Sequence, residues 1–392
     1  MPSDALSAWK ARLHQGLRGL EARSQRRSLA EIRGVNFCSN DYLGLAENPD
    51  LRAAVAEAVR NAERVGGTGS RLLSGQTEEW RDLEEEFAKF AGTESALFFT
   101  TGYAANLGLL SSLIGKDDVV FSDERNHASL IDGMRLSGAR KVIYPHLNLN
   151  ALEDALRQAA GAPWRKVIVT ESVFSMDGDI APLVELANLA EKYHAALILD
   201  EAHATAVHGP AGRGLAAVAG ITTKVLAIIH TCGKTLASAG AFVCGPAVLK
   251  EHLLNHARTF IFSTALPPYF SAQIRAALRL AEGMDAERAS LLQRASVFRV
   301  ALQSEDFDTN SAASQIVPVV LGHNDATLDA ADHLQREGFA VRGIRPPTVS
   351  EGGSRLRLSL TTRIPQEELL RLVHSLVAWR SRQSSLAVAR HA

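Results

Sequence analysis

Seven short apolar segments run through the middle of the chain, and stretches of helical periodicity separate most of them. The segments are ALFFTTG at 96–102, DVVFSD at 118–123, KVIYP at 141–145, KVIVTES at 166–172, AALILDE at 195–201, KVLAIIH at 224–230 and GAFVCG at 240–245. Between them, 148–160 and 182–194 show the apolar spacing of helices. Apolar strands that alternate with helices predict a mostly parallel sheet covered on both faces. The sequence therefore predicts an α/β fold, with ligands at the carboxyl ends of the strands.

The pattern changes after about residue 285, where helices are mixed with short strands. The clearest of these strands are IVPVVLG at 316–322, FAVRGI at 339–344 and RLRLSL at 355–360, and a helix is expected at 365–383. We therefore predict a large α/β domain that binds the ligand and a smaller C-terminal α+β domain. The predicted parts are an N-terminal helix and arm at 1–45, the large domain at 46–285 and the small domain at 286–392.

The N-terminal segment predicts one more helix. Apolar residues recur there at helical spacing, at Leu6, Trp9, Leu13, Leu17 and Leu20. The spacing indicates an amphipathic helix, and we expect it to pack on the body of the protein. The segment lacks the apolar core of a signal peptide, and its acidic residues argue against an organelle transit peptide.

The composition argues against several classes of function. Of the 392 residues, 46% are hydrophobic and 22% charged, and the formal net charge is −1. No excess of charge therefore attracts nucleic acid or an anionic membrane, and no apolar stretch approaches the roughly 18 residues of a membrane span. Cys38, Cys232 and Cys244 are scattered without CxxC spacing, which argues against a disulfide framework or a metal site. We expect a cytoplasmic protein that binds neither nucleic acid nor membrane.

A single lysine, Lys234, stands among small and polar residues in TCGKTLAS, directly after an apolar segment. Asp200 and His203 follow the preceding strand, and TTGYAAN at 100–106 combines a strand end, a glycine turn and a helix start. The free backbone amides of such a helix start form a phosphate site. An isolated lysine, a buried carboxylate and a phosphate site are what pyridoxal phosphate requires: a Schiff base, a partner for the pyridine nitrogen and an anchor.

A competing interpretation starts from GKT at 233–235 and DEAH at 200–203, which are also parts of P-loop helicases. The phosphate-binding loop of that class needs GxxxxGK[ST], and Ile228 stands at the position of the first glycine. The acidic box also precedes the lysine here, which reverses the order of that class. We therefore reject the nucleotidase interpretation.

Nine motifs in the same order resemble those of the α-oxoamine synthase family of fold-type-I pyridoxal-phosphate enzymes. They are NFCSNDYLGL (36–45), GGTGSRLLSG (66–75), TTGYAAN (100–106), SDERNHASLIDG (122–133), ESVFSMDGDIAPL (171–183), DEAHATAVHG (200–209), TCGKTLASAGAF (231–242), RTFIFSTALPP (258–268) and IRPPTVSEGGSRLRLSLT (344–361). Each motif alone is weak, but together they span nearly the whole chain. The resemblance implies a fold-type-I transferase that binds pyridoxal 5'-phosphate and forms a homodimer with shared active sites.

The resemblance also implies roles for individual residues around the cofactor. Lys234 would carry the Schiff base and act as the base, Asp200 would pair with the pyridinium, and His203 would bond the ring hydroxyl. His127 would stack on the ring and polarise the acyl carbonyl. Further cofactor contacts are implied for Gly102, Tyr103, Ser175 and Thr231, and for Ser263 and Thr264 in the site of the neighbouring subunit.

The implied reaction is the decarboxylative condensation of an amino acid with an acyl thioester. RPPTV at 345–349 together with FSTALPP at 262–268 favours the branch that uses L-alanine and a pimeloyl thioester, on CoA or an acyl carrier protein. A sister synthase that uses glycine or serine, an aminotransferase and a cofactor-free protein on this fold remain alternatives. The implied substrate-binding residues are Asn40 and Arg357 for the amino-acid carboxylate, Arg345 and Thr348 beside them, and Arg18 for the acyl carboxylate.

Several of these residues also have plain structural interpretations. His127 could cap a helix, Ser175 could be a turn residue, and RLRL could be a strand with two solvated arginines. Asp200 could likewise cap a helix, and Arg18 could be a solvated helix charge. The chain also departs from the family pattern, with Trp80 where a histidine is usual and Cys232 where an aromatic residue or serine is common.

Overall fold

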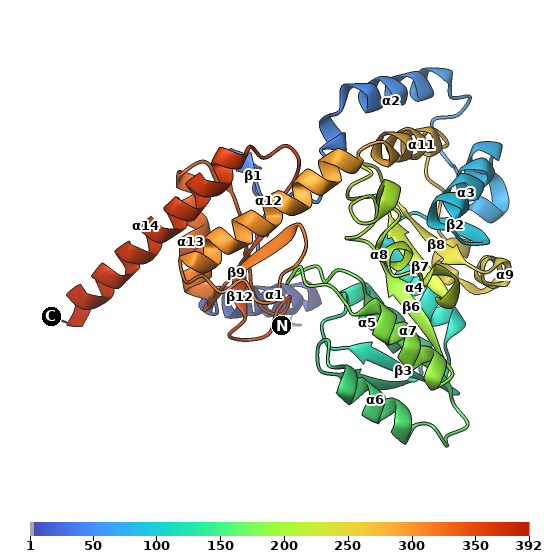
Figure 1. Cartoon of the computed structure of the whole chain (residues 1–392), viewed down its shortest axis with the longest axis horizontal. Coiled ribbons are helices and arrows are strands. Elements are labelled where there is room, and N and C mark those ends of the chain that lie inside the picture. Colours follow the sequence, from blue (N-terminus) through green and yellow to red (C-terminus); the bar gives the residue numbers. More distant parts are fainter. Residues whose placement is uncertain (1–3, 392) are drawn as a thin grey trace.

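The computed structural model describes residues 4–391, and its large domain is built on a seven-stranded sheet (Figure 1). The strand order is β2-β8-β7-β6-β5-β3-β4. The strands are β2 (Ser95–Phe99), β3 (Asp118–Asp123), β4 (Arg140–Tyr144), β5 (Arg165–Glu171), β6 (Ala195–Asp200), β7 (Ala227–Thr231) and β8 (Ala241–Gly245). β8 is antiparallel to both of its neighbours, and the other neighbouring strands are parallel. The predicted mostly parallel sheet and its seven strands are confirmed.

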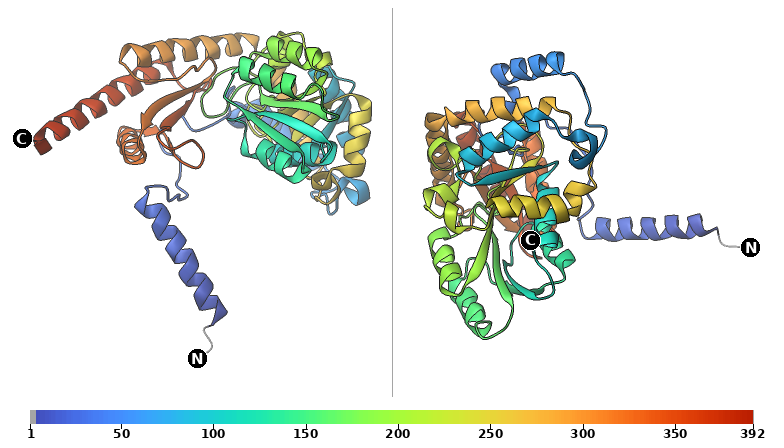
Figure 2. Two further views of the ribbon diagram at one scale, coloured as in Figure 1. Left: turned by 90° about the horizontal axis from the view of Figure 1, so that it is seen from below. Right: turned by 90° about the vertical axis from the view of Figure 1, so that its right-hand side faces the viewer.

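Helices cover both faces of this sheet because its strands are apolar on both sides. α4, α5 and α9 pack on one face, and α6 and α7 pack on the other, beside α3 and α11 (Figure 2). The helices of this domain are α2 (Pro49–Asn61), α3 (Glu78–Ala91), α4 (Gly102–Leu113), α5 (Ala128–Ser137), α6 (Leu149–Gln158), α7 (Leu183–Lys192), α8 (Leu215–Val218), α9 (Ala247–His256), α10 (Arg258–Ile261) and α11 (Tyr269–Glu282). Short helical turns lie at Leu45–Glu47, Arg71–Gly75, Pro210–Gly212 and Thr222–Lys224.

The small domain is a three-stranded antiparallel sheet in the order β11-β12-β9, packed against helices. Its elements are α12 (Asp285–Ser304), β9 (Ile316–Gly322), α13 (Asn324–Arg336), β10 (Phe339–Ala340), β11 (Gly343–Ile344), β12 (Ser354–Ser359) and α14 (Gln366–His391). The predicted strand at 339–344 is therefore two short strands, and only the second joins this sheet. The first, β10, pairs in parallel with β1 (Val35–Asn36) of the N-terminal arm.

The N-terminal arm is part of the core of the small domain. Phe37 and Tyr42 are fully buried and belong to the same apolar cluster as Phe298, Phe339 and Leu358. The arm thereby carries Asn40, between these two residues, to the boundary between the domains. The segment 35–42 is thus attached to the small domain, although most of the chain separates them.

α1 (Ala5–Ala22) forms as predicted but extends away from the rest of the chain (Figure 2). None of its residues is buried, and its apolar residues Leu6, Trp9, Leu13 and Leu17 are between 42% and 63% exposed. The prediction that this helix packs on the body is therefore wrong. Apolar periodicity indicates that one face of a helix is to be covered, but it does not identify the covering surface.

Within residues 4–391, no helix combines the length and the apolar character that a membrane crossing requires. Cys38, Cys232 and Cys244 all carry free thiols. Cys232 and Cys244 are buried in the apolar cluster between the sheet and α3. Cys232 therefore packs in the core, two residues before Lys234.

Candidate active site

The strands of the large sheet end at a cavity of about 410 Å³. β5, β6 and β7 end there at Glu171, Asp200 and Thr231, and the N-terminus of α4 closes one side. Because carboxyl ends of parallel strands meet at one edge, residues far apart in sequence converge on this cavity. Eight of the predicted site residues line it: Asn40, Gly102, Tyr103, His127, Asp200, His203, Thr231 and Lys234.

Lys234 projects from the turn between β7 and β8 into this cavity. It is half-buried, and within residues 4–391 its amine forms no hydrogen bond and no ion pair. Burial lowers the pKa of Lys234, and the charges of Asp200 and Glu171 oppose that effect only in part. A lowered pKa makes the neutral amine more available, which is the form that attacks carbonyl groups and accepts protons.

Asp200 is a buried carboxylate whose two oxygens are both held. Its Oδ1 accepts from the backbone N–H of Ala202 at 2.8 Å, and its Oδ2 accepts from Asn106 Nδ2 at 2.7 Å. Asn106 lies on α4 and also donates to Ser129 on α5. The bond from α4 fixes the carboxylate at the wall of the cavity. Within the described residues, no helix begins directly after Asp200, so the bond to Ala202 is a local turn bond, and the pairing of this carboxylate with a pyridinium stays a prediction.

His203 is buried below the cavity and is held by the N-terminal arm. Its Nδ1 lies 2.7 Å from the hydroxyl of Tyr42, whose Oη is also 3.1 Å from Asn40 Oδ1. Burial, together with the charges of Lys234 and Arg357, holds the pKa of His203 well below its usual value. A neutral imidazole with Nδ1 engaged leaves Nε2 for a ligand in the cavity.

His127 caps the N-terminus of α5 and also lines the cavity. Its Nδ1 accepts from the backbone N–H of Ser129 at 3.3 Å and lies 2.7 Å from the Ser129 hydroxyl. Since Nδ1 acts as an acceptor, we assign the proton of the neutral ring to Nε2. Burial lowers the pKa of His127, which favours this neutral form. The capping interpretation is therefore correct for Nδ1, while Nε2 stays available to a ligand.

The N-terminus of α4, where the phosphate site is predicted, lies at the cavity. Thr101 caps the helix and accepts from the backbone N–H of Ala104, while Gly102 and Tyr103 begin the helix beside the cavity. A Cβ at Gly102 would lie 2.8 Å from Thr231 Cγ2, so only glycine fits there without displacement. The helix start therefore approaches the end of β7 closely, with its first backbone N–H groups at the cavity.

A second cleft of about 690 Å³ adjoins this cavity, and His127 lines both. It lies between the loops that follow β3 and β5 and the small-domain segment 347–350. Ser175 and Thr348 line this cleft, so Ser175 lies outside the cavity where its cofactor role was predicted. The rim carries two guanidinium groups. Arg27 donates to Thr348 Oγ1 at 3.3 Å, and Arg345 donates to the backbone oxygen of Ser24.

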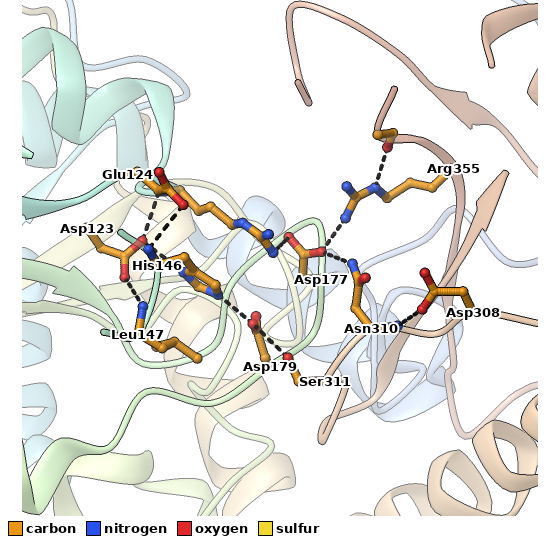
Figure 3. A network of polar contacts seen from close by, with 12 residues as sticks. Asp123, Glu124, His146, Leu147, Asp177, Asp179, Asp308, Asn310, Ser311 and Arg355 are labelled. Carbon is orange, nitrogen blue, oxygen red and sulfur yellow. Dashed lines mark hydrogen bonds and ion pairs between the residues drawn. The ribbon is translucent and has the colours of Figure 1, made fainter. Parts of the chain in front are cut away.

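Arg357 is buried on β12 and reaches the cavity at Asn40. Its guanidinium donates to Asn40 Oδ1 at 3.0 Å, to Ser359 Oγ at 2.6 Å and to the backbone oxygen of Ser175. Arg355, two residues earlier, is also buried and is paired with Asp177 (Figure 3). The interpretation of this strand as one with solvated arginines is therefore wrong.

Five predicted residues line neither cavity: Arg345 and Arg357, described above, and Arg18, Ser263 and Thr264. Arg18 is exposed on α1, Ser263 lines a separate small cavity, and Thr264 is exposed beside it. Trp80 lines the same small cavity and stacks on Phe98 with ring centroids 4.5 Å apart. Trp80 is fully buried, so at this position the chain has a packing residue where the family usually has a histidine.

Five residues of the site were missed by the sequence prediction. Four of them, Tyr42, Asn106, Glu171 and Asp177, lie inside motifs that the sequence analysis quotes, so membership of a motif was a usable signal. Their individual contacts had no signal, because each joins segments that are far apart in sequence. Arg27 lies outside every motif, and only its contact with Thr348 identifies it.

The polar groups of the first cavity fit pyridoxal phosphate. Asn106 Oδ1, Glu171 Oε1 and Ser238 Oγ are buried there without a hydrogen-bond partner within the described residues. Such groups are costly unless a ligand or water satisfies them. A free lysine, a fixed carboxylate opposite it and the start of α4 match the aldehyde, the pyridine nitrogen and the phosphate of this cofactor.

Comparisons with known proteins agree with this geometry. The family model for aminotransferase class I and II matches residues 32–376. An 8-amino-7-oxononanoate synthase of Geobacter sulfurreducens is 47% identical over 366 residues, which cover 92% of this chain and 93% of the relative.

Solved structures give the same result. The crystal structure of 8-amino-7-oxononanoate synthase from Francisella tularensis has a TM-score of 0.78 at 30% identity and covers 90% of this chain and 99% of its own. A structure of serine palmitoyltransferase (SPT) with pyridoxal phosphate has a TM-score of 0.86 at 28% identity, with 96% and 98% covered. The chain therefore belongs to the aminotransferase class I and II family, in the group of the 8-amino-7-oxononanoate synthases.

Proposed function

We propose that this enzyme condenses L-alanine with a pimeloyl thioester to give 8-amino-7-oxononanoate, CO2 and a free thiol, in the cytoplasm, as a step of biotin synthesis. The observation that carries the proposal is the unpartnered amine of Lys234, which shares one cavity with the fixed carboxylate of Asp200. The names of the relatives give the product, and the site supplies the groups that such a reaction needs.

Pyridoxal phosphate, when bound, supplies an aldehyde that binds amines covalently and a ring that withdraws electrons from the attached carbon. The start of α4, with Thr231, would hold its phosphate, and Asp200 would hold its pyridine nitrogen in the protonated form. His203 Nε2 would bond the ring hydroxyl, because Tyr42 engages the other ring nitrogen. His127 would lie against the ring face at the boundary of the two cavities.

The residues of the chain divide the proton and charge transfers between them. Arg357 and Asn40 hold the alanine carboxylate, and the neutral amine of Lys234 takes the proton from the alanine Cα. His127 Nε2–H donates to the thioester carbonyl oxygen while the new C–C bond forms and the C–S bond breaks. The thiolate takes up a proton, the carboxylate leaves as CO2, and a proton returns to Cα, so that one proton is consumed overall.

The terminal carboxylate of a pimeloyl chain requires a cation at the far end of the acyl site. Arg27 donates to Thr348 Oγ1 at the rim of the second cleft, and the backbone oxygen of Arg345 accepts from the backbone N–H of Thr348. Neither arginine forms an ion pair within residues 4–391. Burial and the charge of Arg27 lower the pKa of Arg345. Two guanidinium groups without an acidic partner favour an anion, so we assign the acyl carboxylate to this pair in place of Arg18.

We further propose a homodimer whose active sites are shared. Ser263 and Thr264 lie outside the cavity of their own chain, and the apolar face of α1 is exposed. A second copy that covers α1 would bury this face and could bring both hydroxyls to the neighbouring phosphate site. Sedimentation should give twice the chain mass. Coexpression of Lys234→Ala and Ser263→Ala/Thr264→Ala chains should restore one functional site per heterodimer.

The decisive experiment assays the holoenzyme with alanine, glycine and serine against pimeloyl-CoA and a neutral acyl-CoA of similar length. We expect release of CO2 and thiol with alanine and pimeloyl-CoA above all other pairs. Borohydride treatment followed by peptide mass mapping should place the reduced cofactor on Lys234. A preference for glycine or serine would assign the chain to a sister branch, and transamination without CO2 would assign it to the aminotransferases.

A further inference from the structure

Two arginines on the same face of β12 differ in their partners. Arg355 and Arg357 are two residues apart, so their side chains leave the strand on the same side. Both are buried. Arg355 forms an ion pair with Asp177, whereas Arg357 donates only to neutral oxygens, those of Asn40, Ser175 and Ser359. Of the two, only Arg357 therefore keeps an uncompensated positive charge.

Asp177 is the group that produces this difference. Its Oδ1 accepts from Arg355 and from Asn310 Nδ2 at 2.6 Å (Figure 3), and its Oδ2 lies 3.0 Å from Arg125 Nη1. Its side chain is 4% exposed and lies in the wall of the second cleft. One carboxylate thus binds an arginine of the small domain and an arginine two residues before His127.

The loop that carries Asp177 is fixed in position. Gly178 has a positive φ of 71°, and a Cβ there would lie 1.9 Å from the backbone oxygen of Ile316 on β9. The backbone N–H of Phe174 bonds Asp179 O at 3.0 Å, and that of Ala313 bonds Gly178 O at 2.9 Å. The loop therefore presents the Asp177 carboxylate to both arginines in a defined place.

We propose that Asp177 is a positioning residue that determines which arginine binds the substrate carboxylate. By occupying Arg355 and Arg125 it leaves Arg357 as the guanidinium of this strand that is open to alanine, and it ties the loop of His127 to β12. Without Asp177, two unpaired arginines would line the second cleft and compete for carboxylates. This inference rests on the proposed role of Arg357 in binding the amino-acid carboxylate.

The first test replaces Asp177 by Asn, which has the same shape but no charge. In the holoenzyme we expect the KM for alanine to rise on the order of tenfold, while kcat falls much less and the cofactor Kd is unchanged. Alanine binding, followed by the change in the visible spectrum, should weaken in parallel. Malonate, a dianion that can bridge two guanidinium groups, should become an inhibitor at roughly tenfold lower concentration than in the parent.

The second test separates competition from loss of packing. In the Asp177→Asn/Arg355→Gln double variant the buried competing cation is removed, and of the two arginines only Arg125, whose side chain is 40% exposed, stays unpaired. The KM for alanine and the sensitivity to malonate should therefore return toward the parent values. If Asp177 only joins the two domains, the second substitution removes a further contact and the KM stays high or rises. That result would overturn the proposal, as would a single variant with the malonate sensitivity of the parent.

Two controls complete the design. Asp118→Asn removes a buried carboxylate paired with Arg165 at the opposite end of β3, and should leave alanine and malonate binding unchanged. Arg357→Lys tests the underlying role, because a KM for alanine that stays at the parent value would refute the proposed carboxylate site itself.

If Asp177→Asn does not fold, Asp177→Glu and Asp177→Gln give the same comparison, since they match in size and differ in charge.

Discussion

The cofactor cavity differs from the network of polar contacts around His146 and Asp177 in how its charged groups are paired. In the network, His146 lies between Asp123 at 2.8 Å and Asp179 at 2.5 Å, and Asp177 lies between two arginines (Figure 3). In the cavity, Lys234 has no partner within the described residues, and three buried polar atoms lack one.

The difference separates structure from function. A buried charge destabilises the fold unless it is paired. We therefore interpret the paired charges as structural contacts between loops and domains. Unpaired groups persist only where a ligand completes them or where folding energy elsewhere offsets their cost. On this criterion the cavity is a site for reactants, and the network holds the loops that surround it. The predictions below test this division.

The largest effect is expected for Asp200→Asn in the cavity. An amide cannot keep a pyridine nitrogen protonated, so exchange of the alanine α-proton into heavy water should slow by about 10²–10³-fold. The cofactor should stay bound, because Lys234 and the start of α4 are intact. Proton exchange followed by NMR measures the first quantity, and the visible spectrum the second. Near-normal exchange would show that this carboxylate does not face the ring nitrogen.

A smaller effect is expected for the network, and it concerns stability. Burial disfavours the charged form of His146, but the bonds and charges of Asp123 and Asp179 outweigh burial and raise its pKa to about 9. Because this pKa is raised, the contribution is complete below the ordinary value near 6.5 and is lost as the pH rises through 9. The free energy of unfolding should therefore fall by up to about 3 kcal/mol between pH 6.5 and 9.5.

Urea unfolding at a series of pH values measures this loss, and His146→Gln is the matched variant. Its unfolding free energy should be lower at pH 6.5 and should change less across the same interval. Curves that run parallel for the two proteins would mean that His146 is not the charged centre of the network. The spectrum of the bound cofactor should be the same in both, since His146 does not line the cavity.

The smallest effect is expected at the rim, where Arg27 is exposed and solvent screens its charge. Arg27→Gln should raise the KM for pimeloyl-CoA a few-fold, in keeping with about 1 kcal/mol or less for an exposed pair. The KM for a neutral acyl-CoA and for alanine should not change. Arg18→Gln is the matched control on α1. An equal loss with the neutral donor would remove Arg27 from the acyl site.

Much of the fold and the centre of the site could be predicted from the sequence, for a physical reason. Buried parallel strands are apolar throughout, so each was visible as a run, and their carboxyl ends meet at one edge. Polar residues directly after those runs, such as Asp200 and Thr231, therefore had to converge. The antiparallel direction of β8 was not visible, because an apolar run is the same in either direction.

Contacts between distant segments could not be predicted. The pairing of Tyr42 with His203 joins residues 161 positions apart, and Arg27 meets Thr348 across 321 positions. Ser175 was expected at the cofactor but lines the neighbouring cleft, because the loop after β5 turns toward the small domain. The direction in which α1 extends was equally invisible, since periodicity describes one face of a helix and not the surface that would cover it.

The pairing of β1 with β10 has a consequence for the synthesis of this chain. Val35 and Asn36 leave the ribosome about 300 residues before Phe339 and Ala340, with which they pair. At a synthesis rate of roughly 5–20 residues per second, the arm stays unpaired for about 15–60 s before its partner strand is made. Meanwhile Phe37 and Tyr42, later fully buried, stay in water, while the large domain can already fold. The arm that supports His203 is therefore completed last, and a chain that stops before residue 339 keeps an unfinished cavity.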